Sequence, residues 1–166
     1  QLDKKMSVNG LVAKMGLSGV MGAGRIAKSA DILKAMAKDK QCTVFCGIAG
    51  AMVPGGMKEI IIDLVNNGVI DILVTTGATL THDLIEALGF KHFKGTHRVD
   101  DAELYKKGVV RMYDSYMPAD VYGKLEDFTK KVFKEVPSGI GIRELITEIG
   151  KRVKKESILS ACYKKK

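Results

Sequence analysis

The sequence predicts an α/β fold with a parallel sheet and flanking helices, and the main evidence is two strand–loop–helix units in succession. Thr43–Cys46 and Ile70–Thr75 are short runs of β-branched and apolar residues, interrupted at Gly47 and Gly77. Such runs are typical of strands buried on both faces of a parallel sheet. Two units supply too few strands for a complete doubly wound sheet, so we expect further strands from elsewhere to complete it.

The segment between the two strands has the apolar spacing of a helix. The apolar positions are Met57, Ile60, Ile61, Leu64 and Val65. Pro54 lies near the start of this helix and Gly68 just past its end, as expected at helix boundaries. A second helix follows the second strand as far as Leu88 and ends at Gly89.

The remaining elements follow from apolar spacing and from helix-breaking residues. The expected helices are Val8–Met15, Gly24–Asp39, Asp100–Lys107, Pro118–Val136, Ile142–Val153 and one that begins at Ser157. Val109–Tyr113 predicts a further strand, and Lys91–Val99 predicts a polar loop. Pro137–Gly139 is the clearest break in the chain.

The loops Gly47–Gly56 and Thr75–Thr81 follow the two strands and are rich in small residues. In an open parallel sheet, ligands bind outside the carboxyl ends of the strands, where helix N-termini favour negative charge. The sequence therefore indicates a nucleotide site, to which Thr75, Thr76, Thr79 and Thr81 could add hydroxyls for ribose or phosphate. The alternative is that glycine and threonine form only tight turns and helix caps.

A third glycine-containing segment, Gly22–Ala27, matches the dinucleotide pattern G-x-G-x-x-A. The run before it is interrupted by Ser18 and Gly19, so no strand leads into the pattern. We therefore interpret this segment as the start of a helix.

Composition and charge exclude some classes of function. The chain is 46% hydrophobic and 28% charged, which is ordinary for a globular domain. Most of the net charge of +8 lies in the last sixteen residues, which argues against a nucleic-acid surface. No apolar run reaches the roughly 18 residues of a membrane helix. Without a signal-type segment we expect a cytoplasmic location, and the missing initiator Met suggests that the true N-terminus has been removed.

The cysteines and two of the histidines predict no chemical site. Cys42 and Cys46 would lie roughly 13 Å apart on one face of the first strand, at about 3.3 Å per residue. This is too far for a disulfide, and Cys162 stands alone, so we expect reduced, buried thiols. His92 and His97 lack a nearby cysteine or carboxylate partner. We expect them on a surface loop, with no metal site.

Three segments together resemble one family. They are CTVFCGIAGAMVPGGMKEII, from Cys42; DILVTTGATLTHDLIEALG, from Asp71; and ESILSACYKK, from Glu156. In this order they resemble the N-terminal half of the deoxyhypusine synthases, and the resemblance spans nearly the whole chain. It implies that residues 1–166 are the N-terminal part of a single Rossmann-like, NAD-binding domain that is incomplete without a C-terminal half.

The resemblance also implies an activity and a site. Deoxyhypusine synthases are NAD-dependent homotetramers that oxidise spermidine, hold its aminobutyl group as an imine on an enzyme lysine, and pass it to a lysine of the hypusine-bearing translation factor. The NAD contacts carried over from the family are Gly50, Ala51, Met52, Val53, Pro54, Thr76, Gly77 and Ala78. Thr81 and His82 would lie where the family contacts spermidine and NAD.

The chain departs from the family pattern at His82, where eukaryotic members carry glutamate. An anionic side chain is the natural partner of a polyamine ammonium group. An imidazole could instead bind the nicotinamide ribose or act as an acid or base near neutral pH. The alternative is a helix-start residue held by a backbone contact.

A second departure is that the family's catalytic lysine lies in a C-terminal half that this sequence does not contain. We therefore expect no catalytic residue in this chain and a complementary C-terminal chain as partner, with complete protomers forming a tetramer. Three functions stay open. The chain is part of a deoxyhypusine synthase, part of a related enzyme of the homospermidine synthase kind that acts on other amines, or a non-catalytic regulatory paralogue.

Overall fold

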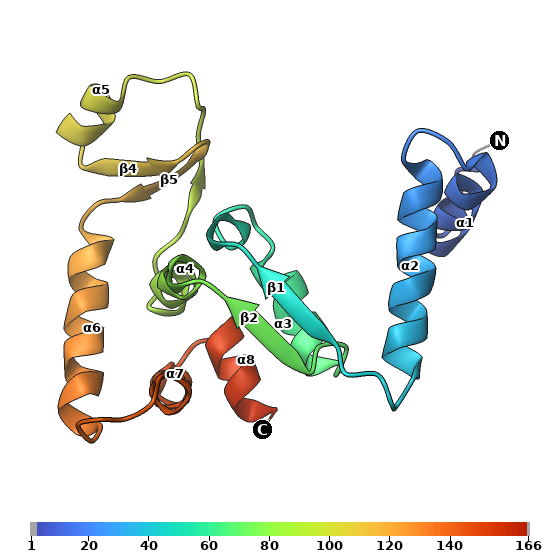
Figure 1. Cartoon of the computed structure of the whole chain (residues 1–166). Helices are drawn as coiled ribbons and strands as arrows, with labels where there is room; N and C mark the ends of the chain where they lie inside the picture. The colour runs from blue at the N-terminus through green and yellow to red at the C-terminus, as the bar shows by residue number, and fades with distance from the viewer. Residues whose placement is uncertain (1–2, 166) are drawn as a thin grey trace. The chain divides into compact units, whose positions relative to one another are not determined.

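The computed structural model describes residues 3–165, and the chain divides between Val44 and Phe45 into two compact units. The first unit is a pair of packed helices, α1 (Val8–Ser18) and α2 (Ala23–Lys38). The second unit contains the remaining elements (Figure 1). These are β1 (Phe45–Ile48), the 3₁₀ helix η1 (Gly50–Met52), α3 (Lys58–Asn66), β2 (Ile72–Thr75), α4 (Gly77–Ala87), β3 (Phe93–Lys94), α5 (Asp101–Lys106), β4 (Val109–Met112), β5 (Ser115–Pro118), α6 (Val121–Glu135), α7 (Ile142–Arg152) and α8 (Ile158–Lys164).

The helix pair of the first unit begins and ends at capping residues. The Ser7 hydroxyl accepts a hydrogen bond from the amide of Gly10 and so caps α1. Gly22, at φ 90°, precedes the first residue of α2. This confirms that the glycine pattern at residues 22–27 is a helix start. The apolar side chains of Ile26, Ile32 and Leu33 are each about half exposed, so this side of α2 stays largely uncovered.

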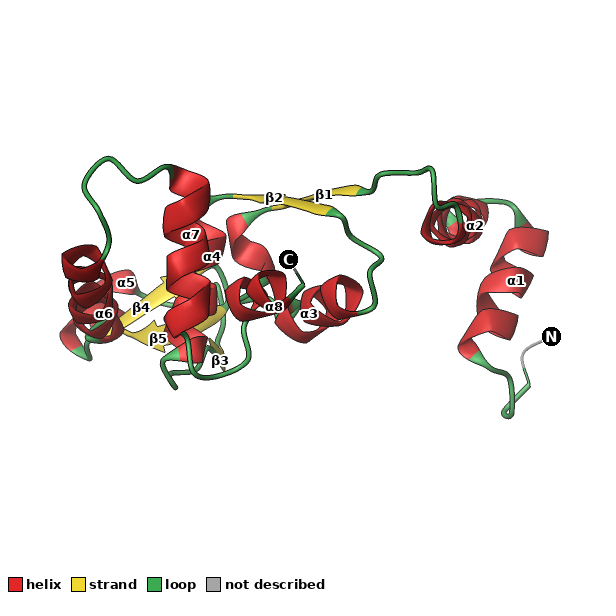
Figure 2. Cartoon of the chain, turned by 90° about the horizontal axis from the view of Figure 1, so that it is seen from below, coloured by secondary structure: helices red, strands yellow, loops and turns green. Residues whose placement is uncertain are grey.

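Strands β1 and β2 form a parallel pair, as predicted, with Phe45 opposite Ile72 and Ile48 opposite Thr75. The prediction that both faces are buried is wrong for this chain. Helices α3 and α8 cover one face of the pair, where Ile48 and Leu73 pack on a core cluster (Figure 2). The cluster consists of Val53, Ile61, Ile62, Val65, Ile158 and Ala161.

The other face of the strand pair is open. Its side chains Phe45, Ile72 and Val74 are 65%, 41% and 56% exposed. They alternate along each strand with the residues that face the helices, as the two-residue period of a strand requires. An apolar face of this kind is therefore left without cover by the described residues.

A second, antiparallel sheet has the strand order β3-β5-β4, and two of its strands were missed. Strand β3 lies inside the expected polar loop. Strand β5 ends at Pro118, the expected first residue of the following helix, which instead begins at Val121. The β4–β5 hairpin turns on Tyr113 and Asp114, and Tyr113 has φ 56°. Two-residue hairpins usually carry glycine or asparagine at such positions, so the turn gave no sequence signal.

The expected helices are present, with ends that differ by a few residues, and the break at Pro137–Gly139 separates α6 from α7. Gly68, which has φ 67°, follows the end of α3, as predicted.

All three cysteines are free, as predicted, but each is half-buried rather than buried. Cys42 precedes β1, so the two N-terminal cysteines do not share a strand. In residues 3–165 no helix is long and apolar enough to cross a membrane.

Candidate functional site

The two predicted loops meet at one edge of the parallel strand pair. Because Ile48 lies opposite Thr75, η1 and α4 both begin at the carboxyl ends of their strands. The Thr75 hydroxyl donates a hydrogen bond to the carbonyl oxygen of Ile48 at 3.3 Å. A Cβ atom built on Gly50 would lie 2.6 Å from the Cβ of Ala78. Contact this close requires glycine at position 50, which fixes one loop against the other.

Thr76 caps the start of α4, and the Thr79 side chain lies against it. The Thr76 hydroxyl accepts a hydrogen bond from the amide of Thr79 at 3.4 Å, and the two hydroxyls lie 3.3 Å apart. Thr79 is fully buried, so its side chain cannot reach a ligand. The capping interpretation therefore holds for this pair. Thr76, Gly77 and Ala78 are exposed at the start of the helix, where a bound group could approach their backbone.

In the first loop, mainly the backbone could contact a ligand. Val53 is 1% exposed and belongs to the core cluster, so a contact with NAD at this position could involve only main-chain atoms. Gly50, Met52 and Pro54 are half-buried and Ala51 is exposed. The predicted NAD contacts of these residues stay predictions.

His82 is buried and lies in a network of titratable side chains. Its Nδ1 atom lies 3.0 Å from Nε2 of His92, and Nδ1 of His92 lies 2.8 Å from Oε1 of Glu86. The other carboxylate oxygen of Glu86 lies 3.4 Å from Nζ of Lys58. Helix α4 therefore supplies two members, His82 and Glu86, which are four residues apart and share a face.

The expectation that His92 is a surface-loop residue is wrong. It lies in the connection after α4, but its side chain is only 5% exposed because it packs between His82 and Glu86. The chain turns back at Gly89, which has φ 104°. The four-residue spacing of His82 and Glu86 indicates a shared helix face but does not place His92 against it. His97, in contrast, is exposed and stacks on Tyr113, as a surface-loop residue would.

The environment of the network sets its charges. Burial lowers the pKa of His82, and the neighbouring His92 lowers it further, so the neutral imidazole is favoured. Burial opposes ionisation of Glu86, but the hydrogen bond with His92 and the charge of Lys58 outweigh it and lower the pKa of this carboxyl. Glu86 is therefore an acceptor on both oxygens. Among the described residues, no group of three or more His, Cys, Asp or Glu side chains could hold a metal ion.

Asp83 is a second buried group that the sequence analysis did not identify. It is fully buried, and its carboxylate accepts hydrogen bonds from the amides of Ile158 at 2.9 Å and Leu159 at 3.1 Å. Burial raises its pKa, and the two backbone hydrogen bonds offset part of that effect. The contact joins α4 to the start of α8, which is also capped by Ser157.

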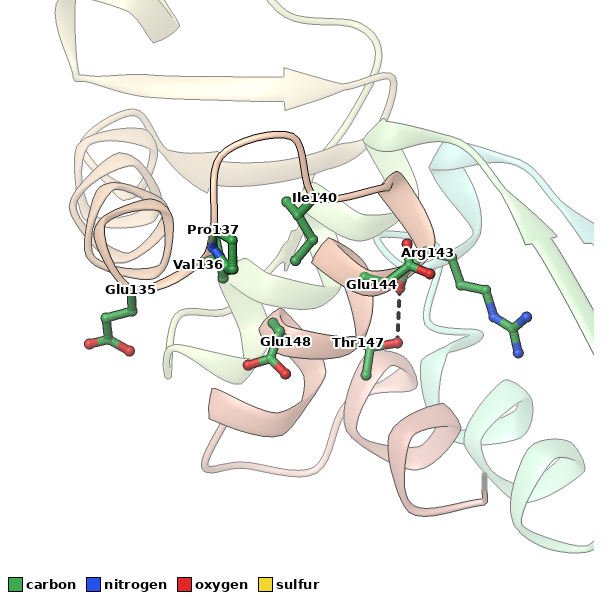
Figure 3. Close-up of a pocket in the computed structure, with 8 residues that line it drawn as sticks. All are labelled: Glu135, Val136, Pro137, Ile140, Arg143, Glu144, Thr147 and Glu148. Carbon is green, nitrogen blue, oxygen red and sulfur yellow. Dashed lines mark hydrogen bonds between the residues drawn. The ribbon is translucent and has the colours of Figure 1, made fainter.

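Two hollows in the described part of the chain lie away from the predicted loops. One, of about 740 Å³, lies at the α6–α7 connection, and the side chain of Arg143 extends away from it (Figure 3). Two of its carboxylates, Glu135 and Glu148, pair with Arg152. The other, of about 810 Å³, lies where β2 begins and includes Ile72, Leu73 and Ile146 in its lining. None of the predicted site residues lines either hollow.

The parallel strand pair, with two contacting loops at its carboxyl edge, places this chain among the α/β proteins, and in open parallel sheets ligands bind at that edge. Residues 10–166 match the deoxyhypusine synthase family model. The chain belongs to the deoxyhypusine synthase family.

Individual relatives agree with this assignment. The chain is 42% identical over 158 residues to a "Probable deoxyhypusine synthase" of Methanosarcina thermophila, covering 95% of this chain and 50% of the relative. It is 37% identical over 150 residues to a "Deoxyhypusine synthase-like protein" of Chlorobaculum tepidum, covering 86% of this chain and 43% of the relative. The chain thus spans about half the length of these curated relatives.

The fold is also found among solved structures. A crystal structure of a "putative deoxyhypusine synthase" from Entamoeba histolytica superposes with a TM-score of 0.68. The match covers 99% of this chain and 58% of the other, at 16% sequence identity. At this identity the similarity concerns the fold alone.

Proposed function

We propose that this chain is the N-terminal part of an NAD-dependent deoxyhypusine synthase. The complete enzyme would transfer the aminobutyl group of spermidine to a lysine of the hypusine-bearing translation factor. The observation that carries the proposal is the family match over residues 10–166, combined with a length about half that of the relatives. A complementary C-terminal part would supply the catalytic lysine and, with further copies, complete the tetramer.

The contacting loops suit an extended, anionic cofactor. Gly50 packs against Ala78, and a Cβ atom built on Gly77 would meet no other atom, so the backbone at the start of α4 is open to a ligand. The first amides of a helix favour phosphate groups. When bound, NAD would accept a hydride from the amine substrate. The chain would hold its diphosphate at Gly77 and Ala78, while Thr81 and His82 lie one turn further along α4.

The cofactor site can be tested with Gly77→Asp. The new carboxylate fills open space and repels the diphosphate, so NAD binding to the assembled enzyme should fall at least about tenfold, equivalent to roughly 1.4 kcal/mol. An acidic residue in the first helical turn is favourable, so the chain should keep its stability. Calorimetric titration with NAD measures the loss, and Gly123→Asp on the exposed part of α6 is the control. Unchanged NAD affinity in Gly77→Asp would place the cofactor elsewhere.

The open face of the strand pair supports the need for a second part. Phe45, Ile72 and Val74 expose apolar surface that a Rossmann-like sheet would cover with helices from the C-terminal part. The hollow where β2 begins includes Ile72 of this face in its lining, together with Ile70 and Ile146. We infer that the C-terminal part packs here and completes a larger parallel sheet.

Reconstitution tests the whole proposal. The chain is produced with and without the C-terminal half of a close relative, and each sample is given NAD, labelled spermidine and the translation factor. Label should appear on the factor only when both parts are present, and native mass spectrometry should find them in equal number. Folded, assembled parts that transfer no label would contradict the proposal.

A related amine transferase is the second candidate. Its support is His82 at the position where eukaryotic members carry glutamate, together with the similarity to deoxyhypusine synthase-like proteins of Chlorobaculum. The same reconstituted sample, supplied with free polyamines in place of the translation factor, separates the two candidates. Label on a small-molecule product alone would favour the second.

A further inference from the structure

Lys58, Glu86, His92 and His82 form a continuous chain of polar contacts from α3 through the connection after α4 to the helix that begins the predicted site. The side chains of Lys58, Glu86 and His92 are 10%, 23% and 5% exposed. Because these side chains are largely buried, each proton between them should satisfy a particular pair of atoms. The positions of these protons decide what His82 can do.

The carboxylate of Glu86 fixes the first proton. An ionised carboxylate can only accept hydrogen bonds, so Nδ1 of His92, 2.8 Å from Oε1, must carry a hydrogen. A neutral His92 then has a bare Nε2, which can only accept. The reverse tautomer of His92 would set a bare nitrogen against a carboxylate oxygen, and two acceptors repel.

The second proton follows from the first. The Nε2 atom of His92 lies 3.0 Å from Nδ1 of His82, so Nδ1 of His82 must donate. In a neutral imidazole the remaining nitrogen carries a lone pair. No buried side-chain nitrogen or oxygen among the described residues lacks a partner, and Nε2 of His82 forms no hydrogen bond within residues 3–165. This nitrogen is therefore the solvent-reachable end of the chain.

We propose that His92 and Glu86 are positioning residues that hold His82 in the Nδ1–H tautomer and thereby present its Nε2 lone pair as an acceptor. The inference rests on the proposed function for its ligand, because an amine substrate carries the N–H donor that such an acceptor binds. Lys58 supports the arrangement, because its positive charge favours the ionised form of Glu86.

The test is nitrogen NMR of the isolated, histidine-labelled chain, in which three histidines give three ring systems. At about pH 8, above the ordinary histidine pKa of about 6.5, the one-bond coupling to hydrogen identifies the protonated nitrogen. We expect hydrogen on Nδ1 of His82 in the unmodified chain. His92→Phe should reverse the tautomer to Nε2–H as the major form, whereas His92→Gln should preserve Nδ1–H because its amide oxygen accepts. His97→Phe is the matched control and should leave His82 unchanged.

Hydrogen on Nε2 of His82 in the unmodified chain would overturn the inference, as would the Nδ1–H form persisting in a folded His92→Phe variant. If that variant fails to fold, Glu86→Leu takes its place because leucine offers His92 no acceptor, and an unchanged proton distribution across both histidines would count against the inference. The measurement needs no NAD, amine or partner. Failure of the reconstituted transferase would therefore leave this result standing, and the reverse tautomer would leave the transferase proposal standing.

Discussion

At the scale of single residues, buried polar groups on α4 join the parts of the second unit. Asp83 binds two amides at the start of α8, and His82 binds His92 in the connection that follows α4. Each replaces contacts with water by hydrogen bonds inside the protein, so removing one partner leaves the other unsatisfied. Exchanging a single acceptor or donor atom at these positions should therefore change the free energy of unfolding.

The first prediction concerns Asp83→Asn. The amide keeps one acceptor oxygen but turns its NH₂ group toward the second backbone amide, so a buried hydrogen bond is lost. Although removing a buried charge offsets part of this, we expect a loss of about 1–3 kcal/mol in the free energy of unfolding. Urea denaturation followed by circular dichroism measures it. Asp63→Asn, on the exposed surface of α3, is the control and should change stability by less than about 0.5 kcal/mol. Equal stability of the two variants would mean that the contact is energetically neutral.

The second prediction concerns acid stability. The pKa of His82 is lowered below the ordinary value of 6.5, so the unfolded chain binds a proton more readily than the folded chain. The stability that comes from keeping His82 neutral in the folded chain is complete above pH 6.5, and it is lost as the pH falls through the folded pKa. His82→Gln should thus show a shallower decline in stability between pH 7 and about 5 than the unmodified chain. Chemical denaturation across this range tests it.

Other groups near His82 titrate differently. Glu86 adds to the free energy of unfolding at neutral pH, and this contribution is lost only as the pH falls below the ordinary pKa of 4.5. The raised pKa of Asp83 has the opposite effect, because it lowers the free energy of unfolding above pH 3.8. Both are present in the two proteins compared, so the difference between the curves reports on His82. Parallel curves would show that His82 does not titrate with folding.

At the scale of elements, apolar spacing and capping residues predicted the helices well because each is a local property of the sequence. Ser157 and Ser160 form a capping box at the start of α8, and Asp100 caps α5. Strand β3 was missed because its pairing with β5 joins residues far apart in the sequence, such as Phe93 and Tyr116. Strand β5 pairs locally with β4, but the hairpin turn at Tyr113 between them lacks the usual glycine.

Helix packing gives the third prediction. Gly150 of α7 lies against α8, and a Cβ atom built there would be 2.7 Å from the carbonyl oxygen of Leu159. Backbone atoms cannot yield as a flexible side chain can, so Gly150→Ala should cost about 1–3 kcal/mol despite its better helix propensity. The matched change Gly123→Ala in α6 meets no atom within 4 Å. It should stabilise the chain by roughly 0.5–1 kcal/mol. Thermal unfolding that ranks the two variants the other way would contradict this packing.

At the scale of the whole molecule, the main feature is the apolar strand face of Phe45, Ile72 and Val74. Parallel strands are normally covered on both faces, and the described residues cover only one. The relatives extend for about as many residues again. These two facts together lead to the proposed C-terminal part.

The fourth prediction tests that surface. Val74→Lys should leave the stability of the isolated chain within about 0.5 kcal/mol, because the side chain is exposed there. It should abolish assembly with the C-terminal part, because an unpaired charge would be buried in the interface. Native mass spectrometry of co-expressed parts gives the readout. Tyr105→Lys, at an exposed position of α5, is the control. Normal assembly of Val74→Lys would exclude this face as the contact.

The sequence by itself determined the α/β class, the parallel strand pair, the approximate positions of the helices and the family, because these depend on periodicity, capping and motifs of neighbouring residues. It also located the two loops that meet at the strand ends. Only the tertiary structure decided that one sheet face is open, that Thr79 and Val53 are buried, and that His92 reaches His82 and Glu86. Burial and hydrogen bonding between distant residues depend on how the elements pack, and no local pattern encodes that packing.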